Sequence, residues 1–170
     1  MVYIVEQNYA KNKEIFNSIV KELKEKIKED VPIDHVGSTA INNMVGKNII
    51  DILIGAKDEN QFEYISGILT EMGYYASSKK DIYQFFASRK EETVSGDIHI
   101  HLVILGTNRY NEFIILRDYL LSNEKEVMDY CNCKKGIMEL ENIDRNMYKE
   151  IKSKYVSDLI ERAKKYYNIK

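Results

Sequence analysis

The stretch DIHIHLVIL, residues 97–105, alternates polar and apolar side chains from one residue to the next. Successive side chains of a β-strand point to opposite faces of its sheet, so this pattern predicts a strand with one continuous apolar face. The opposite face carries Asp97, His99 and His101. Such a strand requires a sheet and a hydrophobic core beneath its apolar face, which constrains how the rest of the chain can fold.

A second strand, predicted for residues 48–55 (NIIDILIG), carries one acidic residue, Asp51. Its even-numbered isoleucines share one face, which we expect to point into the core, while Asp51 and Leu53 share the other. A carboxylate in an apolar strand is costly to bury unless it is paired, hydrogen-bonded or bound to a metal. Asp51 is therefore either a functional acid, such as a metal ligand, or a structural acid that caps backbone or pairs with a lysine.

The two histidines of the alternating strand admit two interpretations as well. The chain has 3 histidines, and the third, His35, lies just before a Gly-Ser turn. Imidazoles at positions 99 and 101 can ligate one metal or bind a phosphate, or they can form a half-buried pair bonded to backbone or tyrosine hydroxyls. If this strand lies beside the strand of Asp51, the three side chains can converge on one metal. Two histidines and one carboxylate suit a transition metal better than magnesium.

The remaining pattern predicts an α/β protein with a mixed sheet (α+β) and a helical C-terminal half, forming a single domain over residues 1–170. The last two strands are expected to form an antiparallel hairpin through the polar loop 89–96, which contains Arg89. The expected strands are 32–37, 48–55, 82–88 and 97–105, and the expected helices are 8–28, 59–72, 110–121, 124–134 and 145–167.

The composition indicates an ordinary globular protein, with 44% hydrophobic and 31% charged residues. The 25 basic and 27 acidic residues give a net charge of −2, which argues against binding to duplex nucleic acid or to an anionic membrane surface. The longest apolar run is too short to cross a bilayer, and the N-terminus does not resemble a secretory signal, so we expect a cytoplasmic location. Cys131 and Cys133 are expected to be reduced.

Four stretches, taken together and in order, resemble the GrpB-like family of the nucleotidyltransferase superfamily. They are HVGSTAINNMVGKNIIDILI (35–54), HIHLV (99–103), LRDYL (116–120) and the helix segment that carries Tyr148 and Lys152. Asparagines replace the Pro-Gly and a later proline of the family's first stretch, and they can still adopt turn conformations. The strongest departure is Leu53, where the superfamily places the second of two metal-binding acids.

The resemblance implies a nucleotidyltransferase-like fold that uses a nucleoside triphosphate and a divalent metal, either Mg, Mn or Zn. It implies Asp51 as a metal ligand, and Asp51 and His101 are the candidate catalytic residues. The assignment of His99 and His101 as further metal ligands comes from the strand alternation. The implied substrate- and phosphate-binding residues are Gly37, Ser38, Thr39, Lys47, Arg117 and Lys152. For Arg117 the alternative is a structural ion pair that ties the helical half to the sheet.

Three functions are compatible with these features, and whether the protein is an enzyme stays open between them. The first is transfer of a nucleotidyl group to a small-molecule acceptor. The second is a non-catalytic module that binds a nucleotide or metabolite and has lost the second acid. The third is a metal-dependent hydrolase that uses Asp51, His99 and His101. In each case the expected partner is a small molecule or nucleotide, with no nucleic acid and no membrane.

Overall fold

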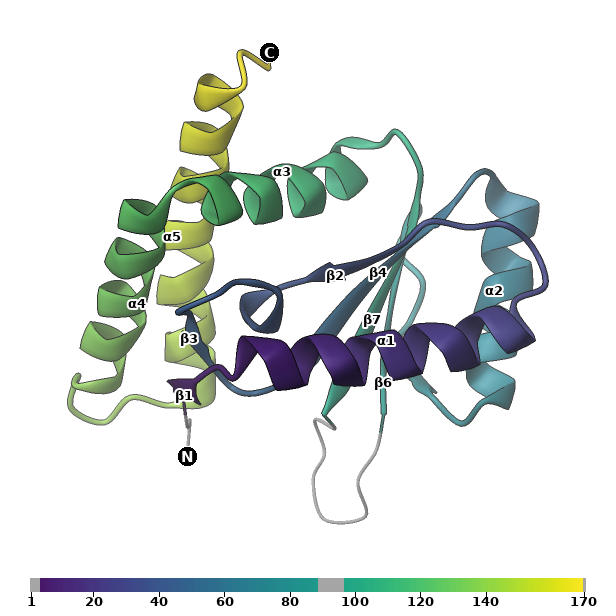
Figure 1. The fold of residues 1–170 in the computed structure, drawn as a ribbon, viewed down its shortest axis with the longest axis horizontal. Coiled ribbons are helices and arrows are strands. Elements are labelled where there is room, and N and C mark those ends of the chain that lie inside the picture. Colours follow the sequence, from purple (N-terminus) through teal and green to yellow (C-terminus); the bar gives the residue numbers. More distant parts are fainter. Residues whose placement is uncertain (1–3, 89–96, 170) are drawn as a thin grey trace.

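A 5-stranded mixed sheet forms the middle of the protein, with helices packed on both of its faces (Figure 1). The computed structural model describes residues 4–88 and 97–169. The elements, with η1 a short 3₁₀ turn, are in chain order β1 (Val5–Glu6), α1 (Tyr9–Lys26), β2 (Ile33–Val36), η1 (Ser38–Ala40), β3 (Val45–Gly46), β4 (Ile50–Ala56), α2 (Glu59–Glu71), β5 (Tyr75–Ala76), β6 (Tyr83–Ala87), β7 (Ile98–Ile104), α3 (Asn108–Ser122), α4 (Glu124–Met138) and α5 (Arg145–Tyr166).

The strands of this sheet lie in the order β2-β4-β7-β6-β5. Strands β4 and β7 are parallel, and the other neighbours pair antiparallel. The parallel register places Asp51 opposite His99 and Leu53 opposite His101. The α/β class, the hairpin of β6 with β7, and the proximity of the two polar strand faces are therefore confirmed. The connecting loop 89–96, with Arg89, lies outside the described residues.

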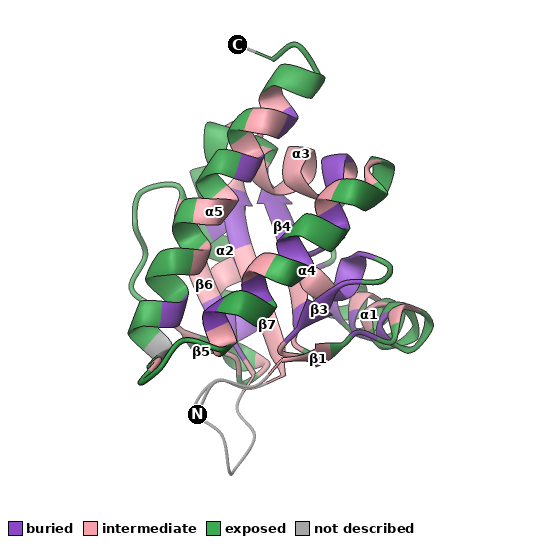
Figure 2. Ribbon diagram, turned by 90° about the vertical axis from the view of Figure 1, so that its left-hand side faces the viewer, coloured by how far each residue is buried: buried purple, intermediate pink, exposed green. Residues whose placement is uncertain are grey.

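One face of the sheet forms the main hydrophobic core together with α1 and α2. Strand β4 is buried along almost its whole length (Figure 2). Its isoleucines at positions 50, 52 and 54 contact the buried sides of α1 and α2, as the alternation predicts. Helix α2 is followed by Gly73, which adopts a positive φ of 86°, the conformation expected of a C-terminal glycine.

The opposite face of the sheet is covered by α3, and α4 and α5 extend this layer beyond the edge of the sheet (Figure 1). Leu53 lies on this face and is 0% exposed, in contact with Val36 and Val103. Helix α4 continues past its predicted end at Lys134 to Met138, because Ile137 is buried against Tyr148 of α5. Strands β1 and β3 pair in a separate small sheet. The sequence does not predict it, because strands of two residues are too short to show an alternating pattern.

An ion pair joins the helical half to the sheet. The Arg117 Nη1 atom of α3 donates to Asp34 Oδ1 of β2 at 2.7 Å, and its Nε atom donates to Asp118 Oδ1 at 2.8 Å. The Tyr110 hydroxyl donates to the second Asp34 oxygen at 3.2 Å. The structural role considered for Arg117 is therefore present in the fold.

Two further findings concern the chain as a whole. Within residues 4–88 and 97–169, we find no helix with both the length and the apolar character needed to cross a membrane. Cys131 and Cys133 are both free thiols, as expected.

Replacing Arg117 with methionine tests the link between α3 and β2. The substitution keeps an apolar side chain but leaves the Asp34 carboxylate, 28% exposed, without its charged donor. We expect the free energy of unfolding, measured by urea titration, to fall by about 1–3 kcal/mol. Asp118→Asn is the matched control, because the Asp118 side chain is 45% exposed. Asp118→Asn should lower the free energy of unfolding by at most about 0.5 kcal/mol. Equal losses in the two variants would contradict the role of Arg117 as the link between α3 and β2.

Candidate functional site

A cavity of about 350 Å³ lies between the sheet and the helical half, lined by the turn after β2, by β4 and β7, and by α3, α4 and α5. We call this cavity the cleft. Among the described residues that line it, the only carboxylate is Asp51, while the cationic side chains are Lys47, Arg117, Lys134 and Lys152. Among the described lining residues, cationic side chains therefore outnumber carboxylates, although the whole chain carries a net charge of −2.

Asp51, His99 and His101 meet at the sheet side of the cleft. The Asp51 Oδ1 atom lies 3.4 Å from His99 Nδ1 and 3.5 Å from His101 Nε2, and the Asp51 side chain is 23% exposed. Burial by itself raises the pKa of the Asp51 carboxyl, but contacts with His101 and His99 outweigh it and hold this pKa well below its usual range. Asp51 is therefore ionised throughout the neutral pH range.

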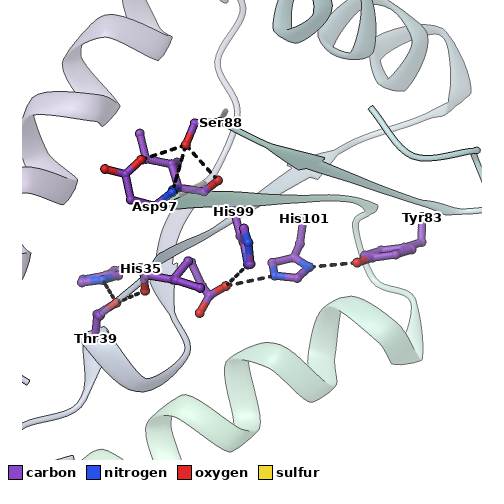
Figure 3. A network of polar contacts seen from close by, with 10 residues as sticks. His35, Thr39, Tyr83, Ser88, Asp97, His99 and His101 are labelled. Carbon is purple, nitrogen blue, oxygen red and sulfur yellow. Dashed lines mark hydrogen bonds and ion pairs between the residues drawn. The ribbon is translucent and has the colours of Figure 1, made fainter. Parts of the chain in front are cut away.

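His101 is held from its other side by a tyrosine. The Tyr83 hydroxyl lies 3.0 Å from His101 Nδ1, so a chain of contacts runs from Tyr83 of β6 through His101 toward β4 (Figure 3). A phenol that donates to Nδ1 leaves the hydrogen of a neutral imidazole on Nε2, facing Asp51. The ring of Phe113 packs 4.7 Å from the His101 ring and limits its movement.

The Gly-Ser turn packs directly on the Asp51 carboxylate. Gly37 has a positive φ of 73°, and a Cβ atom at this position would lie 2.3 Å from Asp51 Oδ2. A Cβ atom on Gly46 would similarly lie 2.2 Å from Ser38 Oγ. Only glycine therefore allows the turn to approach the carboxylate and β3 to approach the turn.

The asparagines of the following segment adopt left-handed backbone conformations. Asn43 has a φ of 58° and Asn48 a φ of 56°. These values agree with the expectation that asparagine can form turns where the family has Pro-Gly and a later proline.

Buried Thr39 and partly buried His35 support this turn from behind. The His35 Nε2 atom lies 3.0 Å from Thr39 Oγ1, which donates to the Ile49 carbonyl at 3.0 Å (Figure 3). The His35 ring stacks on Phe16 with centroids 4.6 Å apart. Thr39 is 0% exposed and does not line the cleft, so its side chain fixes the turn and is not placed to contact a ligand. Of the predicted phosphate-binding residues, the structure brings Gly37, Ser38, Lys47, Arg117 and Lys152 to the cleft.

Lys134 of α4 is a cleft residue that the sequence interpretation missed. It is 3% exposed, its Nζ atom donates to the Val45 carbonyl at 2.7 Å, and this atom lies 4.0 Å from the centre of the Tyr130 ring. Burial, reinforced by the charge of Lys152, lowers the pKa of Lys134 to about 7. The available signal was its position within the buried stripe of α4, which also holds Val127, Tyr130, Cys131 and Ile137.

The residues do not fit the two-metal site that the superfamily implies. Position 53 holds a fully buried leucine in an apolar cluster, so a second carboxylate is absent from the strand. In the part of the chain that the structure describes, no group of three or more His, Cys, Asp or Glu side chains is arranged to hold a metal ion. Asp51, His99 and His101 form a cluster of polar contacts, and their role as metal ligands stays a prediction.

The arrangement of the sheet and helices is that of a nucleotidyltransferase-like fold. A crystal structure of the Cid1 poly(U) polymerase aligns with a TM-score of 0.51 at 10% identity, over 78% of this chain and 45% of that one. The crystal structure of the conserved protein GrpB from Enterococcus faecalis aligns with a TM-score of 0.82 at 21% identity, covering 97% and 99% of the two chains.

The chain belongs to the GrpB protein family, whose sequence profile matches residues 2–162. The glutamate-rich protein GrpB of Alkalihalophilus pseudofirmus is 29% identical over 158 residues, covering 89% of this chain and 86% of that protein. A UPF0157 protein of Streptomyces coelicolor is 27% identical over 134 residues, covering 79% and 69%. The resemblance expected from the sequence is confirmed.

His35 gives the site a testable pH dependence. Burial is the main cause that lowers the pKa of His35 from 6.5 to about 4, so the fold favours its neutral form. The stability that depends on neutral His35 is fully present above about pH 6.5 and is lost as the pH falls from there toward about 4. Between about pH 7 and about pH 4, the free energy of unfolding should fall on the order of 1–2 kcal/mol further in the native protein than in His35→Gln.

Urea titrations at a series of pH values measure this difference. Lys24→Gln, a change at an exposed position of α1, gives the baseline pH profile. If His35→Gln follows the same profile as Lys24→Gln, His35 does not titrate as the structure indicates.

Proposed function

We propose that the protein binds a nucleotide, or a closely related phosphorylated small molecule, in the cleft. The observation that supports this proposal is that Lys47, Lys134 and Lys152 gather in the lining, where Asp51 is the one carboxylate among the described residues. Cationic side chains gathered in a hollow favour an anionic ligand, and phosphate groups are the most highly charged part of a nucleotide. Arg117 contributes less, because Asp34 and Asp118 already occupy its guanidinium group.

The cleft also has the size and the apolar surface that a nucleotide requires. Its volume of about 350 Å³ lies within the range of small-molecule sites. Ile41, Phe113 and Leu116 line it with apolar or aromatic surface against which a base can pack. The similar fold of Cid1, which has been crystallised with MgGTP and with MgATP, supports the choice of ligand class.

Isothermal titration calorimetry with ATP, CTP, GTP and UTP tests the binding proposal. Lys152→Met removes one cation from the cleft and should weaken the affinity by about tenfold or more. Lys154→Met on the same helix is the matched control, because Lys154 is exposed and does not line the cleft. The affinity of Lys154→Met for nucleotides should equal that of the native protein. Binding that is equally strong in both variants, or absent for all nucleotides, would contradict the proposal.

A second candidate function, nucleotidyl transfer, is favoured by the contacts of Asp51. The ionised carboxylate of Asp51 holds two imidazoles beside the turn of Gly37 and Ser38, and imidazole is a common proton acceptor in catalysis. In this reaction an acceptor hydroxyl attacks the α-phosphorus of the nucleotide, and the bond to pyrophosphate breaks. The hydroxyl proton passes to the cluster of Asp51, His99 and His101. A divalent ion has no assigned step here, because the second acid of a two-metal site is absent.

Transfer of a label from α-³²P nucleotides to small molecules of a cell extract tests this candidate. We expect Asp51→Asn to reduce the labelled product by about 100-fold or more, while nucleotide binding persists. Asp158→Asn, at an exposed position of α5, is the control and should retain the activity. Equal label transfer by Asp51→Asn and the native protein would exclude the cluster as the reacting centre. Release of phosphate without labelled product would indicate hydrolysis instead.

A further inference from the structure

Three lysines from three separate segments line the helical side of the cleft, and we call Lys47, Lys134 and Lys152 the lysine cluster. Lys47 follows β3 and its Nζ atom lies 5.2 Å from the centre of the Tyr148 ring. Lys134 projects from α4 and Lys152 from α5. Cations are rarely brought together in this way for stability, because they repel one another and lose hydration when buried.

The surroundings of Lys134 stabilise its charge only in part. Its contacts are one backbone carbonyl, that of Val45, and one aromatic face, that of Tyr130. Across residues 4–88 and 97–169, neither Lys134 nor Lys152 forms an ion pair with a carboxylate. The titratable and charged groups that face Lys134 are Asp51 from β4, Lys47 after β3, Tyr148 and Lys152 from α5, and Tyr130, Cys131 and Cys133 from α4.

We infer that the lysine cluster binds the polyphosphate end of the ligand, and that Lys134 takes up a proton when this anion binds. The inference rests on the proposed nucleotide site and specifies where in the cleft the phosphates lie. It also adds a coupling between ligand binding and proton uptake.

The coupling follows from the charge of the ligand. In the free protein the pKa of Lys134 is about 7, so a substantial part of its amino groups is neutral near neutral pH. A phosphate chain beside the amino group favours the charged form and raises this pKa. By linkage, the affinity for the anion is higher below the free pKa and falls as the pH rises through it.

NMR spectroscopy of the full chain with ¹³C-labelled lysine side chains tests this inference, with inorganic triphosphate as the probe. The Lys134 signal is assigned by its loss in Lys134→Arg. We expect its titration midpoint to rise by about one pH unit or more at saturating triphosphate. The affinity for triphosphate should fall by about tenfold between about pH 6.5 and about pH 8.5. Lys134→Arg is the control, because arginine stays charged over this range, and the change seen in this variant, which includes protonation of the probe itself, is subtracted.

Lys152→Arg provides a second test if the arginine at position 134 disturbs the fold. This variant keeps both the charge of the cluster and the titrating group at Lys134, so the midpoint should still rise. An unchanged Lys134 midpoint with triphosphate bound overturns the inference and leaves the nucleotide site standing. Nucleotide binding without competition from triphosphate also overturns it. Absence of binding by both nucleotides and triphosphate contradicts the proposed function as well.

Discussion

The parallel pairing of β4 with β7 is the constraint on which the rest of the structure depends. Its register sets Asp51 opposite His99 and brings His101 within 3.5 Å of the same carboxylate oxygen. The same register places the isoleucines of β4 against α1 and α2. Because side chains alternate strictly along a strand, a slip of one residue would turn the isoleucines into the cleft and the acid into the core. The hydrophobic core therefore maintains the polar cluster, although the two lie on opposite faces of the sheet.

The face that carries the polar cluster becomes apolar within two residues along β4. Leu53 is packed with Val36 and Val103 beneath α3, so a carboxylate at this position would be buried among hydrocarbon side chains. Leu53 is thus part of the packing of α3 on the sheet. Cationic side chains from the helical half supply the charge of the cleft instead. The nucleotidyltransferase-like fold is thus combined with a cleft in which Asp51 is the one carboxylate among the described lining residues.

Features determined by local periodicity were accessible from the sequence, and features determined by long-range packing were not. The period of two in β4 and β7 identified Asp51, His99 and His101, and asparagine and glycine indicated their turns correctly at Asn43 and Gly73. Strand order could not be predicted from the sequence, because no local pattern specifies which strands are neighbours. Lys134 was missed because lysines on amphipathic helices are usually solvated, and its burial depends on β3, a strand 89 residues away in the sequence. The partner of Arg117 could not be named for the same reason, since Asp34 lies 83 residues away.

The contact between the Gly-Ser turn and Asp51 has a consequence for how the protein can vary. A methyl group at position 37 would overlap the carboxylate at 2.3 Å, and the left-handed backbone there adds strain for any side chain. Alanine at position 51 would remove the overlap with the carboxylate, but its Cβ atom would still lie 2.9 Å from the added methyl group, and the backbone strain would remain. Positions 37 and 51 are therefore epistatic: the effect of a change at one depends on the residue at the other. Loss of the acid at position 51 would therefore ease the demand for glycine at position 37 without removing it.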